Sequence, residues 1–332
     1  MVVVNYHDDL NEVQGDPVLA ALLSAPAAAA PFDRIDWWRN LVKNCDILPL
    51  IAVATDGTQR LVLPLMRRAR TIIALGNWYN FRLTPLATAD ANRPALLRAL
   101  AEDLAGQAPR IILEKLSESD AAELAAAFRS TGWSVWQSVS DINHMLKVGG
   151  RSYAEYLAAR PGPLRTTLKR KGSKVEVSLY RSFDLQAYEA YEDIYAASWK
   201  PEEGSPTFLR RFAEEEGATG RLRMAVARVA GKPVAAQLWT VESGTAFIHK
   251  LAHREDAKAL SPGTTLSAAL FAEVIDRDRV ALIDFGTGDD AYKRDWMEQV
   301  RPRYRLDMLR PRWPGNWPII VRNALRAATG RG

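Results

Sequence analysis

Two short stretches in the second half of the chain carry side chains that could do chemistry. The first contains Asp284, Tyr292 and Lys293 and follows an apolar run that predicts a strand. In α/β sheets, ligands bind in the crevice outside the carboxyl ends of strands. A carboxylate, a phenol and an ammonium there could orient an amine nucleophile, relay its proton or stabilise an oxyanion. The alternative is structural, with Asp289 or Asp290 capping a helix beside an ion-paired lysine.

The second stretch lies where a predicted strand ends and a predicted helix begins. Ser261 is a candidate N-cap, Pro262 stands where a missing N–H costs least, and Gly263 would let an anion approach the backbone. Free amides at this helix start, together with the hydroxyls of Thr264 and Thr265, could bind a phosphate or pyrophosphate. The alternative is that the Ser-Pro-Gly sequence only caps the helix.

Two further candidates, His249 and Lys250, lie at the end of the strand that precedes this helix. Strand alternation predicts that they point to opposite faces, so that at most one of them faces a given groove. The ordinary pKa of histidine suits proton transfer, although His249 could equally be a packing residue. Lys250 could act as a base only if its pKa fell substantially.

The elements that must position these residues follow one order in both halves of the chain. Each half predicts three strands, a helix, a strand, a second helix and a last strand. In the first half these segments are strands 47–55, 60–67 and 71–75, a helix from Pro94, strand 111–113, helix 120–130 and strand 133–139. In the second half they are strands 223–229, 233–241 and 245–252, helix 263–277, strand 281–285, helix 290–297 and strand 303–309. We therefore expect an α/β (α+β) protein with two similar domains, residues 1–148 and 149–332, each a mixed sheet flanked by helices.

Composition sets limits on the function. The chain has 332 residues, of which 48% are hydrophobic and 25% charged, as in ordinary soluble proteins large enough for two cores. Cys45 is the only cysteine, which excludes an intramolecular disulfide and a cysteine-based metal cluster. No long apolar run or signal peptide is visible, so we expect a cytoplasmic protein. Dinucleotide, P-loop and hydrolase-elbow motifs are also missing.

The net charge of +5 favours an anionic partner, and two basic segments could contact one. Residues 160–174 place Arg165 and Lys169 on one helix face, where they could bind the phosphates of a cofactor or nucleic acid or simply be solvated. Residues 313–326 combine two tryptophans, an apolar group and arginines. That segment could lie on an anionic membrane, or its apolar face could dock onto the second domain.

Taken together, Lys250, the Ser-Pro-Gly sequence, Asp284-Phe285, Gly288, Tyr292-Lys293 and Trp296 resemble the FemAB/CelD-like branch of the GNAT acetyltransferase superfamily. The resemblance covers about residues 160–310 and extends less sharply to the first half. It implies two GNAT-like domains with largely antiparallel sheets, the first a degenerate, structural or acceptor-side domain and the second carrying the donor-binding and catalytic motifs.

The resemblance implies an acyltransferase, most simply an N-acetyltransferase that uses acetyl-CoA or another acyl-CoA as co-substrate. It also implies that the enzyme holds no tightly bound cofactor and needs no metal. The acceptor would be an amine or hydroxyl of a small molecule or an envelope or exopolysaccharide precursor. It also implies that Lys250 is the functional residue of the His249-Lys250 pair. The pyrophosphate signature of GNAT enzymes is missing, and residues 261–263 take its place. Aminoacyl transfer from charged tRNA and a non-catalytic scaffold that binds an acyl carrier remain the alternatives.

Overall fold

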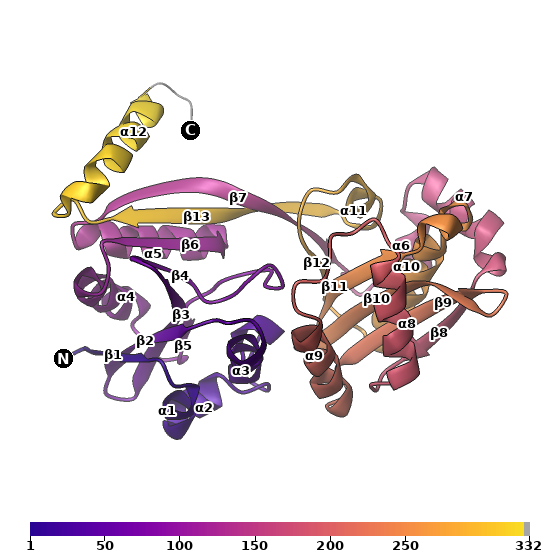
Figure 1. Ribbon diagram of the computed structural model, residues 1–332, viewed down its shortest axis with the longest axis horizontal. Coiled ribbons are helices and arrows are strands. Elements are labelled where there is room, and N and C mark those ends of the chain that lie inside the picture. The colour runs from indigo at the N-terminus through magenta and orange to yellow at the C-terminus, as the bar shows by residue number, and fades with distance from the viewer. Residues whose placement is uncertain (329–332) are drawn as a thin grey trace. The chain divides into compact units, whose positions relative to one another are not determined.

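The computed structural model describes residues 1–328 and divides into two compact units. The first unit contains residues 1–142 and 302–332, and the second contains residues 143–301. Figure 1 shows that each unit is built from strands with helices on their faces. This confirms the predicted fold class of mixed sheets flanked by helices.

In the first unit, β4 and β6 pair in parallel, whereas the pairs β1–β2, β2–β3, β3–β4, β3–β5 and β6–β13 are antiparallel. Its strand order is β1-β2-β3-β4-β6-β13-β7, and β5 pairs with β3. The strands are β1 (Val3–His7), β2 (Pro49–Asp56), β3 (Gln59–Arg68), β4 (Thr71–Ala74), β5 (Leu86–Ala87), β6 (Arg110–Leu116), β7 (Ser134–Lys147) and β13 (Gln299–Leu309). The helices are α1 (Leu10–Gly15), α2 (Pro17–Leu22), α3 (Ile35–Asn44), α4 (Arg93–Asp103), α5 (Glu118–Ser130) and α12 (Trp317–Ala328).

The second unit repeats this arrangement, with β11 and β12 as its parallel pair. Its strand order is β7-β12-β11-β10-β9-β8. The strands are β8 (Glu176–Tyr180), β9 (Leu222–Val229), β10 (Lys232–Glu242), β11 (Thr245–His253) and β12 (Leu282–Thr287). The helices are α6 (Tyr153–Ala158), α7 (Gly162–Lys171), α8 (Leu185–Ala196), α9 (Pro206–Ala218), α10 (Pro262–Ala272) and α11 (Ala291–Trp296), and one π-helical turn (Glu273–Arg277) extends α10.

The last strand of each repeat completes the sheet of the other unit. Residues 143–147 of β7 pair with β12, and residues 304–309 of β13 pair with β6. The predicted domains 1–148 and 149–332 differ from the observed units for this reason, because residues 302–332 belong to the first unit. Periodicity shows that a strand exists, but its pairing partner depends on tertiary structure.

Local sequence explains where several helices begin. Asn92, Ser117, Asp184 and Ser205 each accept a backbone N–H bond at the start of a helix. Ser152 forms a reciprocal capping box with the residue three positions on. Each cap satisfies an amide that would otherwise lack a partner and is worth about 1 kcal/mol.

The two units have separate cores. In the first, Leu97 and Leu100 of α4 and Phe128 of α5 pack on the sheet. In the second, Phe271 of α10 packs against Trp239 of β10, with their ring centroids 5.2 Å apart. Within residues 1–328, no helix is both long and apolar enough to cross a lipid bilayer.

Candidate functional site

The two parallel strands of the second unit separate at their carboxyl ends. Their pairing runs from Thr245 with Leu282 to Phe247 with Asp284 and then stops. β11 nevertheless continues to His253, and β12 continues to Thr287. The helix α10 follows β11, so its first turn belongs to the same edge of the sheet. A sheet that opens at this edge can admit a ligand between two strands.

A β-bulge in β11 changes the direction of two predicted site residues. Leu238 pairs with Lys250 and Trp239 pairs with Ile248, so His249 is the extra residue. Its ring lies 4.9 Å from the ring of Phe212 in α9. The Lys250 ammonium lies 5.2 Å from the centroid of the Tyr195 ring in α8. The predicted alternation of His249 and Lys250 is therefore wrong, since both side chains point to the face that α8 and α9 cover.

Lys250 forms a largely buried ion pair with Glu203, which comes from the loop between α8 and α9. The shortest distance between the ammonium and the carboxylate is 2.7 Å, and the two side chains are 12% and 10% exposed. Burial lowers the pKa of Lys250, while the charge of Glu203 opposes that shift. Burial also raises the pKa of the neighbouring Tyr195 phenol to about 12, so this phenol stays protonated at neutral pH.

The same loop contributes Trp199 and Lys200. The ring of Trp199 lies 4.4 Å from the ring of His253 at the end of β11. Burial lowers the pKa of Lys200, and the carboxylates of Asp290 and Glu203 oppose this shift. The loop thus interacts with residues that follow or end both separating strands.

A cavity of about 490 Å³ opens between this loop, α8 and α9. Tyr188, Tyr191 and Tyr195 form one wall, with successive ring centroids 5.5 and 5.8 Å apart. The charged residues that line the cavity are Glu192, Lys200, Glu202 and Glu203. Aromatic faces next to carboxylates attract cations, so the cavity suits a ligand that bears an amine.

Asp284 is buried at the point where β12 leaves β11. One of its carboxylate oxygens accepts hydrogen bonds from the Gly286 amide at 2.8 Å and from the Asn143 side chain at 2.7 Å. The backbone of Gly286 has a φ of 68°, which favours glycine. Asp284 therefore holds the turn at the end of β12 in place.

Lys293 also stabilises the turn at the end of β12. Its ammonium donates to the carbonyl oxygens of Thr287 and Gly288 at 2.5 and 3.1 Å, and the residue is 4% exposed. Tyr292 instead is 38% exposed, with its ring 5.6 Å from that of Phe285. Of the three candidate site residues Asp284, Tyr292 and Lys293, only Tyr292 is accessible.

The predicted phosphate-binding turn has an unexpected geometry. Ser261 adopts a left-handed conformation with a φ of 52°, and its side chain makes no capping bond to α10. Its hydroxyl accepts a hydrogen bond from Lys171 of the basic helix α7 at 3.1 Å. Ser261 is therefore the N-cap residue of α10, as predicted, but its side chain does not make the capping bond. Position 261 is the helix boundary, but its hydroxyl bonds to a cation.

The remaining residues of this turn differ in whether they could contact a ligand. The amides of Thr264 and Thr265 donate to the Ser261 carbonyl at 3.1 and 3.3 Å, so they are engaged within the first turn. A side chain at Gly263 would meet only the His253 ring, at 3.7 Å, which leaves space above the backbone. Pro262 is buried and starts the helix.

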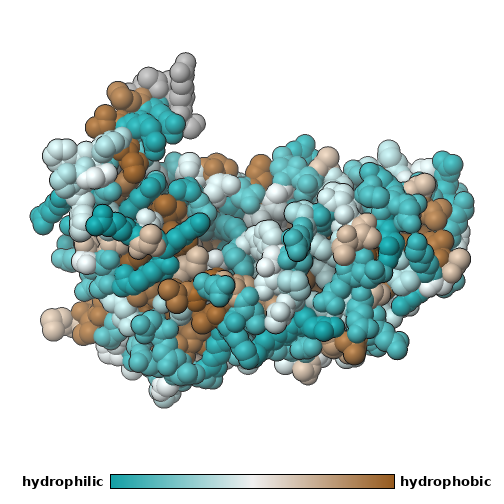
Figure 2. Space-filling model, in the orientation of Figure 1, coloured by the Kyte–Doolittle hydropathy of each residue, from teal (hydrophilic) through white to brown (hydrophobic). Residues whose placement is uncertain are grey.

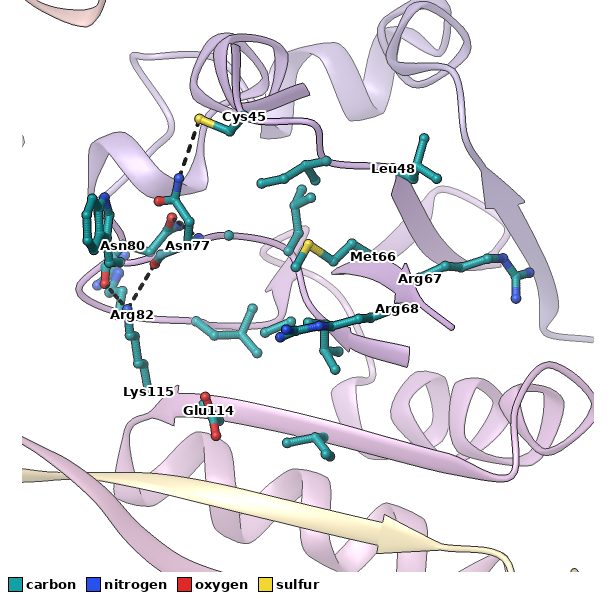
Figure 3. Close-up of a pocket in the computed structure, with 18 of the residues that line it drawn as sticks. Cys45, Leu48, Met66, Arg67, Arg68, Asn77, Asn80, Arg82, Glu114 and Lys115 are labelled. Atoms are coloured by element: carbon teal, nitrogen blue, oxygen red, sulfur yellow. Dashed lines mark hydrogen bonds between the residues drawn. The ribbon is translucent and has the colours of Figure 1, made fainter. Parts of the chain in front are cut away.

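A second cavity, of about 800 Å³, lies in the first unit. There the parallel pairing of β4 and β6 ends at Ile73 and Ile112, and the chain returns to β6 only at Leu83. Figure 3 shows Arg68, Glu114 and Lys115 around this cavity. The Lys115 ammonium donates to the carbonyl oxygens of residues 77 and 80, and burial lowers its pKa. Cations outnumber carboxylates in the lining, so this cavity suits an anionic group.

The sequence patterns did not reveal several of these residues. Glu203 and Lys200 lie in a loop without periodicity, and Asn143 lies on a strand from the first repeat. His144, also on β7, is fully buried with its Nε2 atom 3.1 Å from Asp289. No local signal predicts such partners, because their contacts form only in the folded sheet.

Comparison with protein families identifies the domain type. Residues 163–294 match the model of an acetyltransferase (GNAT) domain. This range starts in α7 and ends in α11, so it includes both separating strands and the turn before α10. No curated protein sequence matches the chain.

Several solved structures share the fold over nearly the whole chain. FemX is 9% identical and has a TM-score of 0.64, with 95% of this chain and 100% of FemX covered. L-PGS from Bacillus licheniformis is 13% identical, with a TM-score of 0.60 and coverages of 95% and 96%. A tandem GNAT protein from the clavulanic acid biosynthesis pathway is 12% identical, with a TM-score of 0.52 and coverages of 92% and 98%. At such low identity these similarities establish the fold alone.

Proposed function

Because residues 163–294 form a GNAT-type acetyltransferase domain, we propose that this protein is an acyltransferase that uses an acyl-CoA-type thioester. The acceptor is an amine, or secondarily a hydroxyl, of a small molecule or a cell-envelope saccharide precursor. The observation that supports this best is the separation of β11 and β12 beside the first turn of α10. This separation leaves an opening in the sheet. The basic helix α7 and the tyrosine-lined cavity, which suits an amine, lie next to this opening.

The donor phosphates would bind at the start of α10. Lys171 and Ser261 supply an ammonium and a hydroxyl, while Gly263 leaves room for the ligand. The hydroxyls of Thr264 and Thr265 and the positive end of the helix dipole add to the attraction for an anion. The acyl chain would then extend between the two separated strands.

The acceptor would bind in the tyrosine-lined cavity. Glu203 lines this cavity and forms an ion pair with Lys250. Its carboxylate can therefore bind the acceptor ammonium, while Lys250 partly neutralises the negative charge of that carboxylate. In the reaction, the bound ammonium first loses a proton to solvent. The resulting neutral amine attacks the thioester carbonyl carbon, the C–N bond forms and the C–S bond breaks. The thiolate leaves, and the proton lost by the amine passes to a base or to solvent. Positioning the two substrates supplies much of the rate enhancement.

The structure suggests distinct parts for the predicted residues. Lys250 and the accessible Tyr292 are our candidates for contact with substrate. Asp284 and Lys293 are positioning residues, since both are buried and hold the end of β12. His249 packs against α9 and bonds to Thr240 at 2.8 Å, so we assign it to the support of the bulge.

Calorimetry with acetyl-CoA tests the donor assignment. We expect saturable heat for the whole chain and at least about tenfold weaker binding for Lys171→Glu, because the variant repels the donor phosphates. Lys43→Glu, which makes the same charge change on the exposed end of α3, should bind like the unchanged protein. Absence of heat with acetyl-CoA and longer acyl-CoA thioesters would reject the donor class.

Aminoacyl transfer from charged tRNA is the second candidate, and the exposed basic face of α7 next to Ser261 favours it. Binding of charged tRNA with a steep salt dependence, without binding of CoA thioesters, would support this candidate instead. If neither donor bound, a non-catalytic scaffold would be the better description.

A further inference from the structure

Helix α12 presents an apolar stripe to solvent. Trp317, Val321 and Leu325 follow one another at four-residue spacing, so they share one face of the helix. They are 58%, 56% and 62% exposed. Figure 1 shows α12 projecting from the end of β13, and Figure 2 shows hydrophobic surface along it at the upper left.

The charge around this stripe has a single sign. From Met308 to the last residue, the sequence contains five arginines and no aspartate or glutamate. Arg322 and Arg326 each follow a stripe residue by one position, so they lie along one side of the stripe. An exposed apolar face with arginines at its border is the pattern of helices that lie in a membrane interface.

A second basic group belongs to the same surface. Residues 67–70, which comprise the end of β3 and the turn to β4 and are called the turn 67–70 below, expose Arg67, Arg68 and Arg70. A hollow of about 180 Å³ is lined by Arg67 and Arg70 of this turn together with Trp313, which precedes α12. Trp313 is 49% exposed. The turn and the segment that leads into α12 are therefore adjacent.

We propose that the turn 67–70 and helix α12 form a binding surface for a membrane that contains anionic phospholipids. The stripe would enter the boundary between headgroups and acyl chains, where tryptophan is favoured. The arginines would contact lipid phosphates, and each cation near the surface strengthens attachment. A second copy of the chain fits this surface poorly, since it would bring the same arginines face to face.

Sedimentation of the full chain with vesicles tests the proposal. One vesicle type contains phosphatidylcholine alone, and in the other about a third of the lipid is phosphatidylglycerol. We expect binding to the anionic vesicles that falls as salt is added. The apolar variant Trp317→Ser/Val321→Ser/Leu325→Ser and the charge variant Arg70→Glu/Arg322→Glu should each bind at least about tenfold more weakly.

Matched controls separate this surface from general charge effects. Lys43→Glu/Arg98→Glu makes the same charge change at other exposed positions of the first unit and should bind like the unchanged chain. Circular dichroism verifies that each variant is folded. Equal binding to both vesicle types, unchanged binding of both surface variants, or an equal loss in the control would overturn the proposal. Gel filtration that showed a dimer abolished by the apolar variant would also overturn it.

Discussion

The ion pair between Lys250 and Glu203 connects the bulged strand β11 to the loop that lines the tyrosine cavity. Both side chains are largely buried. Burying two charges costs desolvation energy, and their mutual attraction offsets that cost only while both are present. The pair therefore couples the conformation of a functional loop to a residue of the sheet.

Removing one partner should reveal this coupling. We expect Lys250→Met to lower the free energy of unfolding by about 3 kcal/mol, because the Glu203 carboxylate stays buried without its cation. The double variant Lys250→Met/Glu203→Gln should recover part of that loss. Urea unfolding of the single and double variants measures the coupling. If the effects of the two substitutions simply added, the pair would not act as a unit.

The lowered pKa of Glu298 predicts how the stability of the protein depends on pH. Hydrogen bonding from Arg151, aided by the charge of Arg160, lowers the pKa of Glu298 from its ordinary 4.5. A group with a lowered folded-state pKa stabilises the protein above its unfolded pKa and loses that contribution as pH falls through the folded value. We expect Glu298→Gln to cost about 1 kcal/mol at neutral pH.

This cost should shrink as the pH falls below about 4.5. Thermal unfolding of both proteins at neutral and acidic pH measures the difference. A cost that stays the same across this range would mean that the charge of Glu298 is unimportant.

Sequence alone singled out Asp284, Tyr292 and Lys293 as candidates, but it did not predict which of them are buried. Asp284 stood out because it lies near the end of a predicted strand, and Lys293 because it follows that strand; in the structure Asp284 lies in β12 and Lys293 in α11. Their buried hydrogen bonds to Gly286, Thr287 and Gly288 depend on a turn whose shape no spacing rule gives. Glu203 was not predicted, because its partner lies 47 positions along the chain.

At the scale of elements, the packing of α9 depends on a single glycine. A Cβ atom at Gly217 would lie 2.4 Å from the backbone nitrogen of Phe183. We expect Gly217→Ala to destabilise the protein by about 1 to 3 kcal/mol, because α9 must shift to relieve the overlap. Thermal unfolding measures this effect.

Gly172 offers a matched control at the end of α7. An added Cβ atom there would meet nothing within 4 Å, and its φ is −57°. Gly172→Ala should leave the protein unchanged or stabilise it by about 0.5 kcal/mol, through the entropy of the unfolded chain. Equal effects at both glycines would contradict the close approach of α9 to Phe183.

The sequence predicted the central elements and missed those at the edges. The predicted strands 47–55 and 60–67 correspond to the antiparallel pair β2–β3, and the predicted strands 223–229 and 233–241 correspond to the pair β9–β10. The strands β1 and β8 were not predicted, because these edge strands are short and mix exposed and half-buried residues. The bulge at His249 was missed for a related reason, since an inserted residue leaves no trace in a strand of mostly apolar residues.

At the scale of the whole molecule, the exchange of closing strands decides which segments can fold alone. We expect residues 143–301 to fold cooperatively, because they include the strand that pairs with β12. Residues 149–332, the predicted domain, should fold poorly. They lack residues 143–147 and carry β13 without its partner β6. Both segments can be compared by circular dichroism and thermal unfolding, and cooperative unfolding of the longer one alone would contradict the exchange.

The exchange also orders events while the chain is being made. When the ribosome has released residue 142, the first unit still lacks β13, which is encoded after the entire second unit. At translation rates of about 5 to 20 residues per second, the nascent β6 edge waits on the order of ten seconds for its partner. During that interval it is an open template for mispairing, so the unit made first is the one with greater need of a chaperone.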